Sequence, residues 1–436
     1  MANGSGEPSA TALVGMEGFV VTSQIVHDGE HWLLVETTGP SRWCPSCGVA
    51  GVGNGRRRVV VRDLPIAGVP TVLVWDKRTF RCREQLCERG SWSETSSLIA
   101  SRASLTERAR AEICRRVGHD LDTVAEVARS SGSAGDGAHQ AVIDHGDELI
   151  ASDERVGRTV GVGVDEHTFQ HANARRRTQM ATTFVDIDRA RLLDVVPGRS
   201  GDVVRDWVNE RPDGWAAQIQ VATIDAFRGY ATAIGDVLPD ATLVIDHFHA
   251  IRLASACVDD VRRRVQQTTL GHRGHKGDPL YGIRRLLLRT WDHLSERGWE
   301  RLRAGLAAGD PDGEVAAVWL ARELLVEVYA AEDLAHAKRR LVVFFQHAAE
   351  ADIAELTRLA RTIDAWRDEI LAFHTTGGAS NGPTEAVNLI LEKIRRIGHG
   401  YRNFDNYRRR LLLGCGIQWT TVPTRRIRGR QPAFAA

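Results

Sequence analysis

The sequence lacks any apolar stretch that approaches the roughly 18 residues needed for a membrane-spanning helix. Its polar start, residues 1–8, contains no positively charged segment followed by an apolar one, so no secretory signal is predicted. With 43% hydrophobic and 26% charged residues, the composition is typical of a soluble globular protein. We therefore expect a cytoplasmic protein with no membrane partner. Its 436 residues exceed one ordinary core and indicate about two to four domains.

Cysteine is also scarce, and the seven residues would leave one thiol unpaired in any disulfide framework. A reducing cytoplasm would not preserve such bridges. Cys114, Cys257 and Cys415 are scattered along the chain, so we expect them to be buried thiols. The other four form two close pairs, Cys44 with Cys47 and Cys82 with Cys87.

This paired spacing is the one that a tetrahedral zinc site with four thiolate ligands requires. Short β runs at residues 58–62 and 71–75, with a turn at Pro65 and Gly68, lie between the pairs and would bring them together. The alternative is four unligated thiols, which we consider less favoured because two such pairs rarely arise by accident in a small β segment. We predict a structural zinc ion, Zn²⁺, held by Cys44, Cys47, Cys82 and Cys87.

The chain has almost no net charge, +1, but its charges are segregated. From Lys393 to Arg430 there are eleven Lys or Arg residues and one acidic residue, Asp405. Aromatic residues interleave with this run, which favours phosphate contact over a merely solvated helix face. The predicted DNA-binding residues are Lys393, Arg395, Arg396, Arg402, Arg408 and Arg409, together with a smaller cluster, Arg56, Arg57 and Arg58.

Between residues 105 and 149 the apolar positions recur with a helical period. Three helices are predicted there, and a helix-turn-helix unit fits this layout. Because Gly132, Gly135 and Gly137 separate the last two helices, we expect a linker over residues 130–137 that is longer and looser than the usual tight turn.

The next region alternates strands and helices. Strands are predicted at 159–164, 178–187, 191–196, 219–224 and 242–245, and helices at 201–210, 226–237 and from about 249. This order predicts a mixed α/β sheet with crossovers. Residues 257–374 show no convincing strand and read as a helical insertion, after which Pro383 opens a final helix over about 384–397.

Acidic residues occupy the predicted strand ends of this sheet. Asp165, Asp225 and Asp246 each follow a strand, where open α/β sheets place their sites, and Glu385 falls in the first turn of the final helix. Phosphodiester cleavage by two divalent ions about 4 Å apart requires such carboxylate oxygens. Any one of these acids taken alone is more readily explained as a solvent-exposed carboxylate at a strand end or helix N-terminus, where acids are favoured.

The ordered motifs Val164-Asp-Glu166, Thr223-Ile-Asp-Ala-Phe-Arg-Gly-Tyr230, Val244-Ile-Asp-His-Phe-His249, Ser380-Asn-Gly-Pro-Thr-Glu-Ala-Val-Asn388 and His399-Gly-Tyr-Arg-Asn-Phe404 resemble the ISL-three family of insertion-sequence transposases. The resemblance covers nearly the whole chain. It implies a DDE active site of Asp165, Asp225 and Glu385 holding two Mg²⁺ or Mn²⁺ ions in a ribonuclease H-like domain. Asp246 and His249 match a D-x-x-H signature and are expected to support the site. Asp246 also remains open as the second Asp, and His249 as a simple helix-start histidine.

The resemblance implies a bacterial DNA transposase, nucleoid-associated when bound to DNA. It would bind terminal inverted repeats in double-stranded DNA, cleave the ends and join 3′ hydroxyls to target DNA, as a homodimer or larger synaptic oligomer. The alternatives are an inactive DNA-binding regulator derived from a transposase and a ribonuclease H-like nuclease without strand transfer. The predicted multidomain α+β layout is a β segment (1–40), a zinc-binding module (41–100), a helix-turn-helix domain (101–152), a catalytic core (153–256 and 376–420) with a helical insertion (257–375), and a basic tail (421–436).

Overall fold

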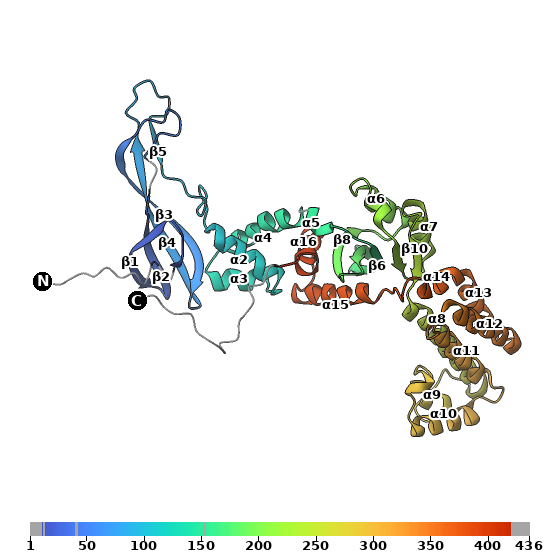
Figure 1. Ribbon diagram of the computed structural model, residues 1–436. Helices are drawn as coiled ribbons and strands as arrows, with labels where there is room; N and C mark the ends of the chain where they lie inside the picture. The colour runs from blue at the N-terminus through green and yellow to red at the C-terminus, as the bar shows by residue number, and fades with distance from the viewer. Residues whose placement is uncertain (1–10, 12–13, 40–41, 152, 420–436) are drawn as a thin grey trace, which may run out of the picture. The chain divides into compact units, whose positions relative to one another are not determined.

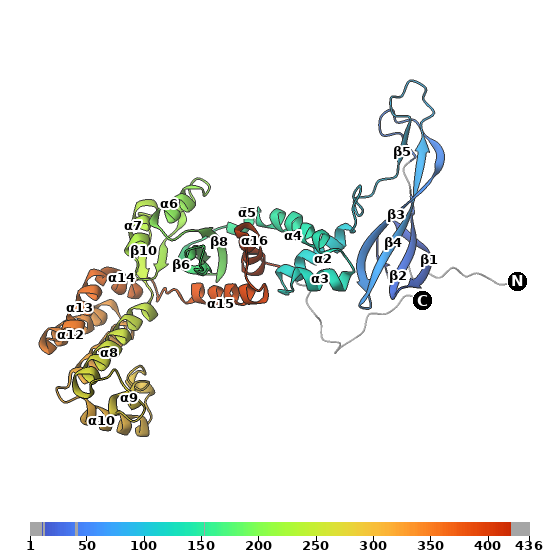
Figure 2. The same cartoon turned by 180° about the vertical axis from the view of Figure 1, so that it is seen from behind.

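The computed structural model describes residues 11, 14–39, 42–151 and 153–419 (Figures 1 and 2). The predicted basic tail, 421–436, lies outside the described residues. The chain divides into two compact units. The first unit comprises Met1–Arg155 with Lys393–Ala436, and the second comprises Val156–Glu392.

A five-stranded sheet with the order β1-β2-β4-β3 forms the N-terminal part of the first unit, and β5 pairs with β4. Figure 1 shows β3 and β4 as a long ribbon with β5 near one end. The strands are β1 (Phe19–His27), β2 (Glu30–Thr37), β3 (Val52–Ile66), β4 (Val69–Arg81) and β5 (Ser91–Ser93). Because β2 pairs with β4, the predicted boundary at residue 40 lies within one sheet.

The β3–β4 hairpin confirms the predicted turn but is far longer than the predicted β runs. Ile66 pairs with Val69, and the two residues between them, Ala67 and Gly68, both have positive φ, as tight hairpin turns require. Near the turn, Val61 and Trp75 pack in an apolar core. Farther out the ladder continues to Val52 through Gly- and Arg-rich sequence, whose low β propensity gives no sign of a strand.

Helices complete the first unit: α2 (Glu107–Gly118), α3 (Val124–Ser131), α4 (Gly135–Ile150), α5 (Asp153–Val156) and α16 (Phe404–Cys415). The predicted loose linker is wrong, because α3 and α4 are separated by three residues only. Gly132 ends α3 in the left-handed conformation, with φ 66°, which glycine adopts without strain. The buried side chains of Ile113, Val117 and Val127 form the shared core.

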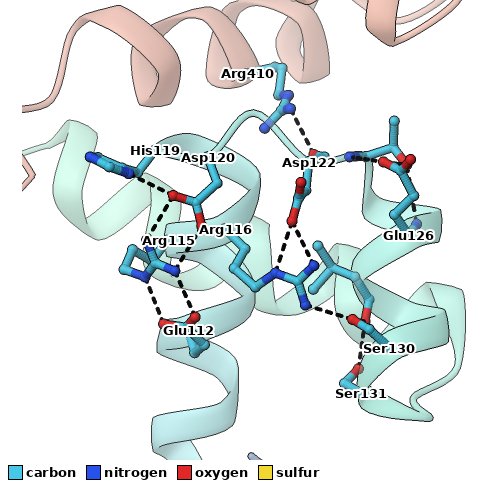
Figure 3. A network of polar contacts seen from close by, with 12 residues as sticks. Glu112, Arg115, Arg116, His119, Asp120, Asp122, Glu126, Ser130, Ser131 and Arg410 are labelled. Atoms are coloured by element: carbon cyan, nitrogen blue, oxygen red, sulfur yellow. Dashed lines mark hydrogen bonds and ion pairs between the residues drawn. The ribbon is translucent and has the colours of Figure 1, made fainter. Parts of the chain in front are cut away.

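An arginine network fixes these helices to one another (Figure 3). Arg116 donates to Asp122 at 2.9 Å and 2.6 Å and to Ser130 at 2.6 Å. From α16, Arg410 donates to the carbonyl of Asp122 at 2.8 Å. Arg115 donates to the carboxylates of Glu112 and Asp120.

The second unit contains a five-stranded mixed sheet with the order β10-β9-β6-β7-β8. Its strands are β6 (Gly161–Gln170), β7 (Gln179–Asp186), β8 (Arg191–Pro197), β9 (Val221–Ile224) and β10 (Thr242–Ile245). Strands β6, β7 and β8 form an antiparallel meander, whereas β9 and β10 run parallel to β6. The crossovers contain α6 (Gly201–Asn209), η1 (Ala216–Gln218) and α7 (Arg228–Val237). This confirms the predicted mixed α/β sheet.

The rest of the second unit is helical, and Figure 1 shows α8 and α11 to α14 gathered together. The elements are α8 (His247–Leu270), α9 (Pro279–Ile283), η2 (Trp291–His293), α10 (Glu296–Gly309), α11 (Glu314–Tyr329), α12 (Leu334–Ala351), α13 (Ala354–Ala365), α14 (Arg367–Leu371), η3 (Ala372–His374) and α15 (Gly382–Ile397). The predicted start of the insertion at 257 lies inside α8. None of the helices in the described ranges has the length and apolar character to cross a bilayer.

Candidate functional sites

Three acidic residues follow the positions at which the parallel pairing of three adjacent strands ends. Val164 of β6 pairs with Ile224 of β9, and Ile224 pairs with Ile245 of β10. Asp165, Asp225 and Asp246 come directly after these positions, so they lie at the same edge of the parallel part of the sheet.

The prediction that Asp165 ends its strand is wrong, because β6 runs on to Gln170. After β9 has ended, β6 keeps its antiparallel partner β7, and Asp165 pairs there with Thr183. Asp165 is therefore held by backbone pairing on one side only, at the point where the strand loses its parallel neighbour.

His249 connects two of the acids. Asp246 caps α8, and its side chain accepts a hydrogen bond from the backbone N–H of His249 at 3.3 Å. The Nε2 atom of His249 lies 2.6 Å from Asp225 Oδ2, and its Nδ1 atom lies 3.5 Å from Asp246 Oδ2. Burial lowers the pKa of His249, but the contacts with Asp225 and Asp246 outweigh it and raise the pKa to about 9.

Glu385 reaches the same cluster from α15. One ligand atom from each of Asp246, His249 and Glu385 lies within 4.8 Å of the others, a spacing that could hold a metal ion. Asp225 contacts this group through His249. Of the three predicted ligands Asp165, Asp225 and Glu385, only Glu385 belongs to such a compact group among the described residues.

Two asparagines orient the carboxylates, and the sequence interpretation missed both. Asn381 donates its backbone N–H to Asp246 at 3.0 Å and its side-chain amide to Asp225 at 3.3 Å. Asn388 donates to Asp165 Oδ2 at 2.6 Å. A signal was available, because Asn388 is three residues after Glu385 and therefore lies on the same side of α15.

A glycine allows α15 to approach the sheet this closely. A Cβ atom at Gly163 would lie 2.1 Å from Thr384 Oγ1 and 3.1 Å from Asn381 Oδ1, well inside van der Waals contact. Any larger residue at Gly163 would require the side chain of Thr384, in the first turn of α15, to move.

Asp165 is largely buried beside like charges. Burial and the negative charge of Asp225 raise the pKa of Asp165 to about 7. Burial also raises the pKa of the neighbouring Glu166, against the opposing effect of Arg199, whose Nε atom lies 3.1 Å from the Glu166 carboxylate. The raised pKa values show that ionising these closely spaced carboxylates is unfavourable. A hard divalent cation favours such oxygen ligands, because its charge stabilises their ionised form.

The four paired cysteines converge in the first unit, as predicted. The sulfur of Cys44 lies 3.8 Å from that of Cys87, and the sulfur of Cys47 lies 3.5 Å from that of Cys82. All four sulfurs lie within 4.8 Å of one another. A tetrahedral zinc with Zn–S bonds of about 2.3 Å places its sulfurs about 3.8 Å apart, so the cluster fits a structural zinc ion. The backbone N–H of Cys47 also helps to lower the pKa of Cys44 to about 6, which favours the thiolate.

The predicted basic residues differ in their surroundings. Arg56 contacts Glu36 and Asp76, the latter at 3.0 Å, and Arg409 contacts Asp147 at 2.6 Å. Arg395, Arg396 and Arg408 also have interaction partners. The exposed members include Arg57, Arg58, Lys393 and Arg402.

Comparisons with known proteins give a consistent class. A family model described as a transposase of the ISL3 type matches residues 162–411, more than half of the chain. A second, described as the zinc-finger of transposase IS204/IS1001/IS1096/IS1165, matches residues 40–87, which include all four paired cysteines. The chain is therefore of the transposase class. It belongs to the ISL3 family of insertion-sequence transposases.

The individual relatives share low sequence identity with this chain. The transposase for insertion sequence element IS1001 of Bordetella parapertussis is 27% identical over 227 residues, 52% of this chain and 55% of that protein. The transposase for IS1557 of Mycobacterium tuberculosis is 26% identical over 262 residues, 56% of this chain and 57% of that protein. The chain thus spans about half the length of these curated relatives. A Drosophila P element transposase strand transfer complex is similar at a TM-score of 0.42 and 9% identity, covering 72% of this chain and 92% of that one, which is too weak a likeness to inform the function.

The sulfur cluster predicts one zinc ion per chain. Purified protein should contain one equivalent of zinc by metal analysis, and Cys47→Ser should reduce it several-fold, because three thiolates hold the ion more weakly than four. Cys114→Ser, which changes a cysteine outside the cluster, should keep the zinc. Full zinc content in Cys47→Ser would contradict the assignment.

The raised pKa of Asp165 predicts a pH-dependent stability in the absence of divalent cations. An acid with a higher pKa in the folded chain favours folding at low pH, and this contribution is lost as pH rises from its ordinary value of 3.8 to about 7. Because each pKa unit corresponds to about 1.4 kcal/mol, wild type should lose roughly 4 kcal/mol more than Asp165→Asn over this range. Urea unfolding at several pH values measures the difference, and parallel pH profiles would refute it.

Proposed function

We propose that the protein is a DNA transposase that binds the terminal inverted repeats of an insertion sequence, cleaves its ends and joins their 3′ hydroxyls to target DNA. The observation that supports this most strongly is the convergence of acidic side chains at one sheet edge, with Glu385 within 4.8 Å of Asp246 and His249. A mixed sheet that begins with an antiparallel meander and continues through parallel crossovers is consistent with a ribonuclease H-like catalytic domain.

The proposed metal ligands are Asp165, Asp225 and Glu385, holding two Mg²⁺ or Mn²⁺ ions. The donor chemistry supports this, because crowded, partly buried carboxylates are costly unless a cation compensates their charge. When bound, such ions neutralise charge on the attacked phosphate and activate the attacking oxygen.

The remaining polar residues act as positioning groups in this proposal. His249 holds the carboxylate of Asp225 at 2.6 Å, and Asn388 holds that of Asp165 at 2.6 Å. Asn381 contacts both Asp225 and Asp246 and so fixes the loop before α15 relative to two strand ends. Asp246 stabilises the first turn of α8 from its buried position and remains the rival candidate for the second metal-binding Asp.

Double-stranded DNA is the proposed partner, as transposon end and as target. The zinc module and the helix-turn-helix would read the inverted repeats, with phosphate contacts supplying affinity and base edges supplying selectivity. Two ends have to be cut together, so we propose a homodimer or a larger synaptic assembly.

A cleavage assay separates the two candidate aspartates. With Mg²⁺ and a labelled duplex carrying the terminal repeat of the element, Asp225→Asn should abolish nicking, because a metal ligand is lost. Asp246→Asn should retain nicking reduced by about 10- to 100-fold, the usual effect of losing an outer hydrogen-bond partner of a metal site. The product is measured on denaturing gels.

Asp240→Asn is the matched control, because Asp240 is exposed in the turn before β10. This variant should cut the duplex as wild type does. Retained cleavage in Asp225→Asn would overturn the ligand assignment. Cleavage by none of the proteins, with DNA bound and Mg²⁺ present, would refute the catalytic proposal.

A further inference from the structure

The outer part of the β3–β4 ribbon contains a hollow with a strongly basic lining. It has a volume of about 670 Å³, and its lining includes Arg42, Arg56, Arg78 and Arg83 but no acidic residue. Arg42 and Arg83 stand two residues before Cys44 and directly after Cys82, so the hollow adjoins the cysteine cluster.

The four arginines differ in how their charge is compensated. Arg56 contacts Glu36 and Asp76, and Arg78 contacts Glu36 at 2.9 Å. In the part of the chain that the structure describes, no side-chain hydrogen bond or ion pair is made by Arg42 or Arg83. Two exposed cations therefore remain available to an anion, while the other two are held in place by carboxylates.

Glycines leave the floor of the hollow without side chains. Gly51, Gly53 and Gly55 all belong to the lining, and a Cβ atom at Gly53 would meet nothing within 4 Å. Thr79 donates to the carbonyls of Asn54 and Gly55 at 2.6 Å and 2.9 Å and holds the β3 backbone against β4 at this point. Because glycine has no side chain, a bulky polyanion can approach the backbone closely at these positions.

Helix α4, the last helix of the predicted helix-turn-helix region, is a poorer surface for phosphate. Helix α4 has four acidic residues and no Lys or Arg. The nearby Arg115 and Arg116 are bound to carboxylates of their own unit (Figure 3). The charge distribution therefore favours the ribbon hollow over α4 for the attraction of nucleic acid.

We propose that this hollow binds the phosphodiester backbone of duplex DNA, with Arg42 and Arg83 as the phosphate ligands. This deepens the proposed function, on which the choice of DNA as partner rests. Binding here is independent of base sequence, because guanidinium contacts to phosphates position the protein but do not read bases. The hollow thus supplies affinity, and selectivity arises elsewhere.

The salt dependence of binding tests the proposal. The zinc-loaded chain is bound to a labelled duplex of random sequence at several salt concentrations. A plot of the logarithm of the association constant against the logarithm of the salt concentration has a negative slope of about 0.9 per phosphate contact. The double variant Arg42→Gln, Arg83→Gln should lower this slope by roughly 1.8 and weaken binding several-fold at low salt. Arg297→Gln, an exposed arginine of α10, is the control and should leave the slope unchanged.

A second substitution avoids the neighbourhood of the cysteines. Gly53→Glu places a negative charge in open space within the hollow, so it should weaken binding without disturbing the fold, while Gly53→Gln should bind nearly as wild type. Zinc content is measured in every variant. An unchanged slope in the arginine variant with zinc retained, or equal binding by Gly53→Glu and Gly53→Gln, would overturn the proposal. Tighter, Arg42- and Arg83-dependent binding of duplex RNA of the same length would overturn the choice of DNA.

These outcomes are separate from those of the cleavage assay. If the protein binds random duplex through Arg42 and Arg83 but never cuts a transposon end, the phosphate site is supported and the catalytic proposal is refuted. If the protein cuts ends in a Mg²⁺-dependent reaction but the arginine variant has an unchanged salt slope, the catalytic proposal is supported and the phosphate site is refuted.

Discussion

The close packing of α15 on β6 is the constraint on which the acidic site depends. Thr384 and Asn381 occupy the space that a side chain at residue 163 would fill, so the helix can approach the strand only because Gly163 has none. This contact joins segments more than two hundred residues apart. It places Glu385 beside His249 and Asp246, and Asn388 beside Asp165. The long run of helices from α8 to α14 can then leave the sheet and return without altering the site.

Like charges brought together in this way oppose folding, and the surrounding groups reduce the cost. His249 contacts Asp225 and Asp246, and amides from Asn381 and Asn388 donate to three carboxylates. The compensation is incomplete, because the pKa of Asp165 stays raised at about 7. A site that keeps residual repulsion between carboxylates binds divalent cations favourably, since the cations remove it.

Local patterns in the sequence predicted much of this architecture. Strand β10 and the acids after β9 and β10 were predictable, because short apolar runs end abruptly at Asp225 and Asp246. The cysteine cluster was predictable from spacing alone. The extension of β6 past Asp165 was not, because it arises from pairing with β7 rather than from the local sequence. The contact between His249 and Asp225 and the role of Asn381 depend on tertiary geometry that no local period encodes, whereas the helical spacing of Asn388 from Glu385 was a usable signal. The length of the β3–β4 ribbon was missed for the same reason, since its Gly- and Arg-rich outer half has poor strand propensity and is held by pairing.

Divalent-cation binding at the acidic cluster is the central claim, and a direct titration tests it. Zinc-loaded protein is titrated with Mn²⁺, and the free ion is followed by its electron paramagnetic resonance signal. About two Mn²⁺ ions should bind per chain, and Glu385→Gln and Asp165→Asn should each bind fewer. Wild-type protein that binds no Mn²⁺, or variants that bind it as wild type does, would contradict the shared cation site.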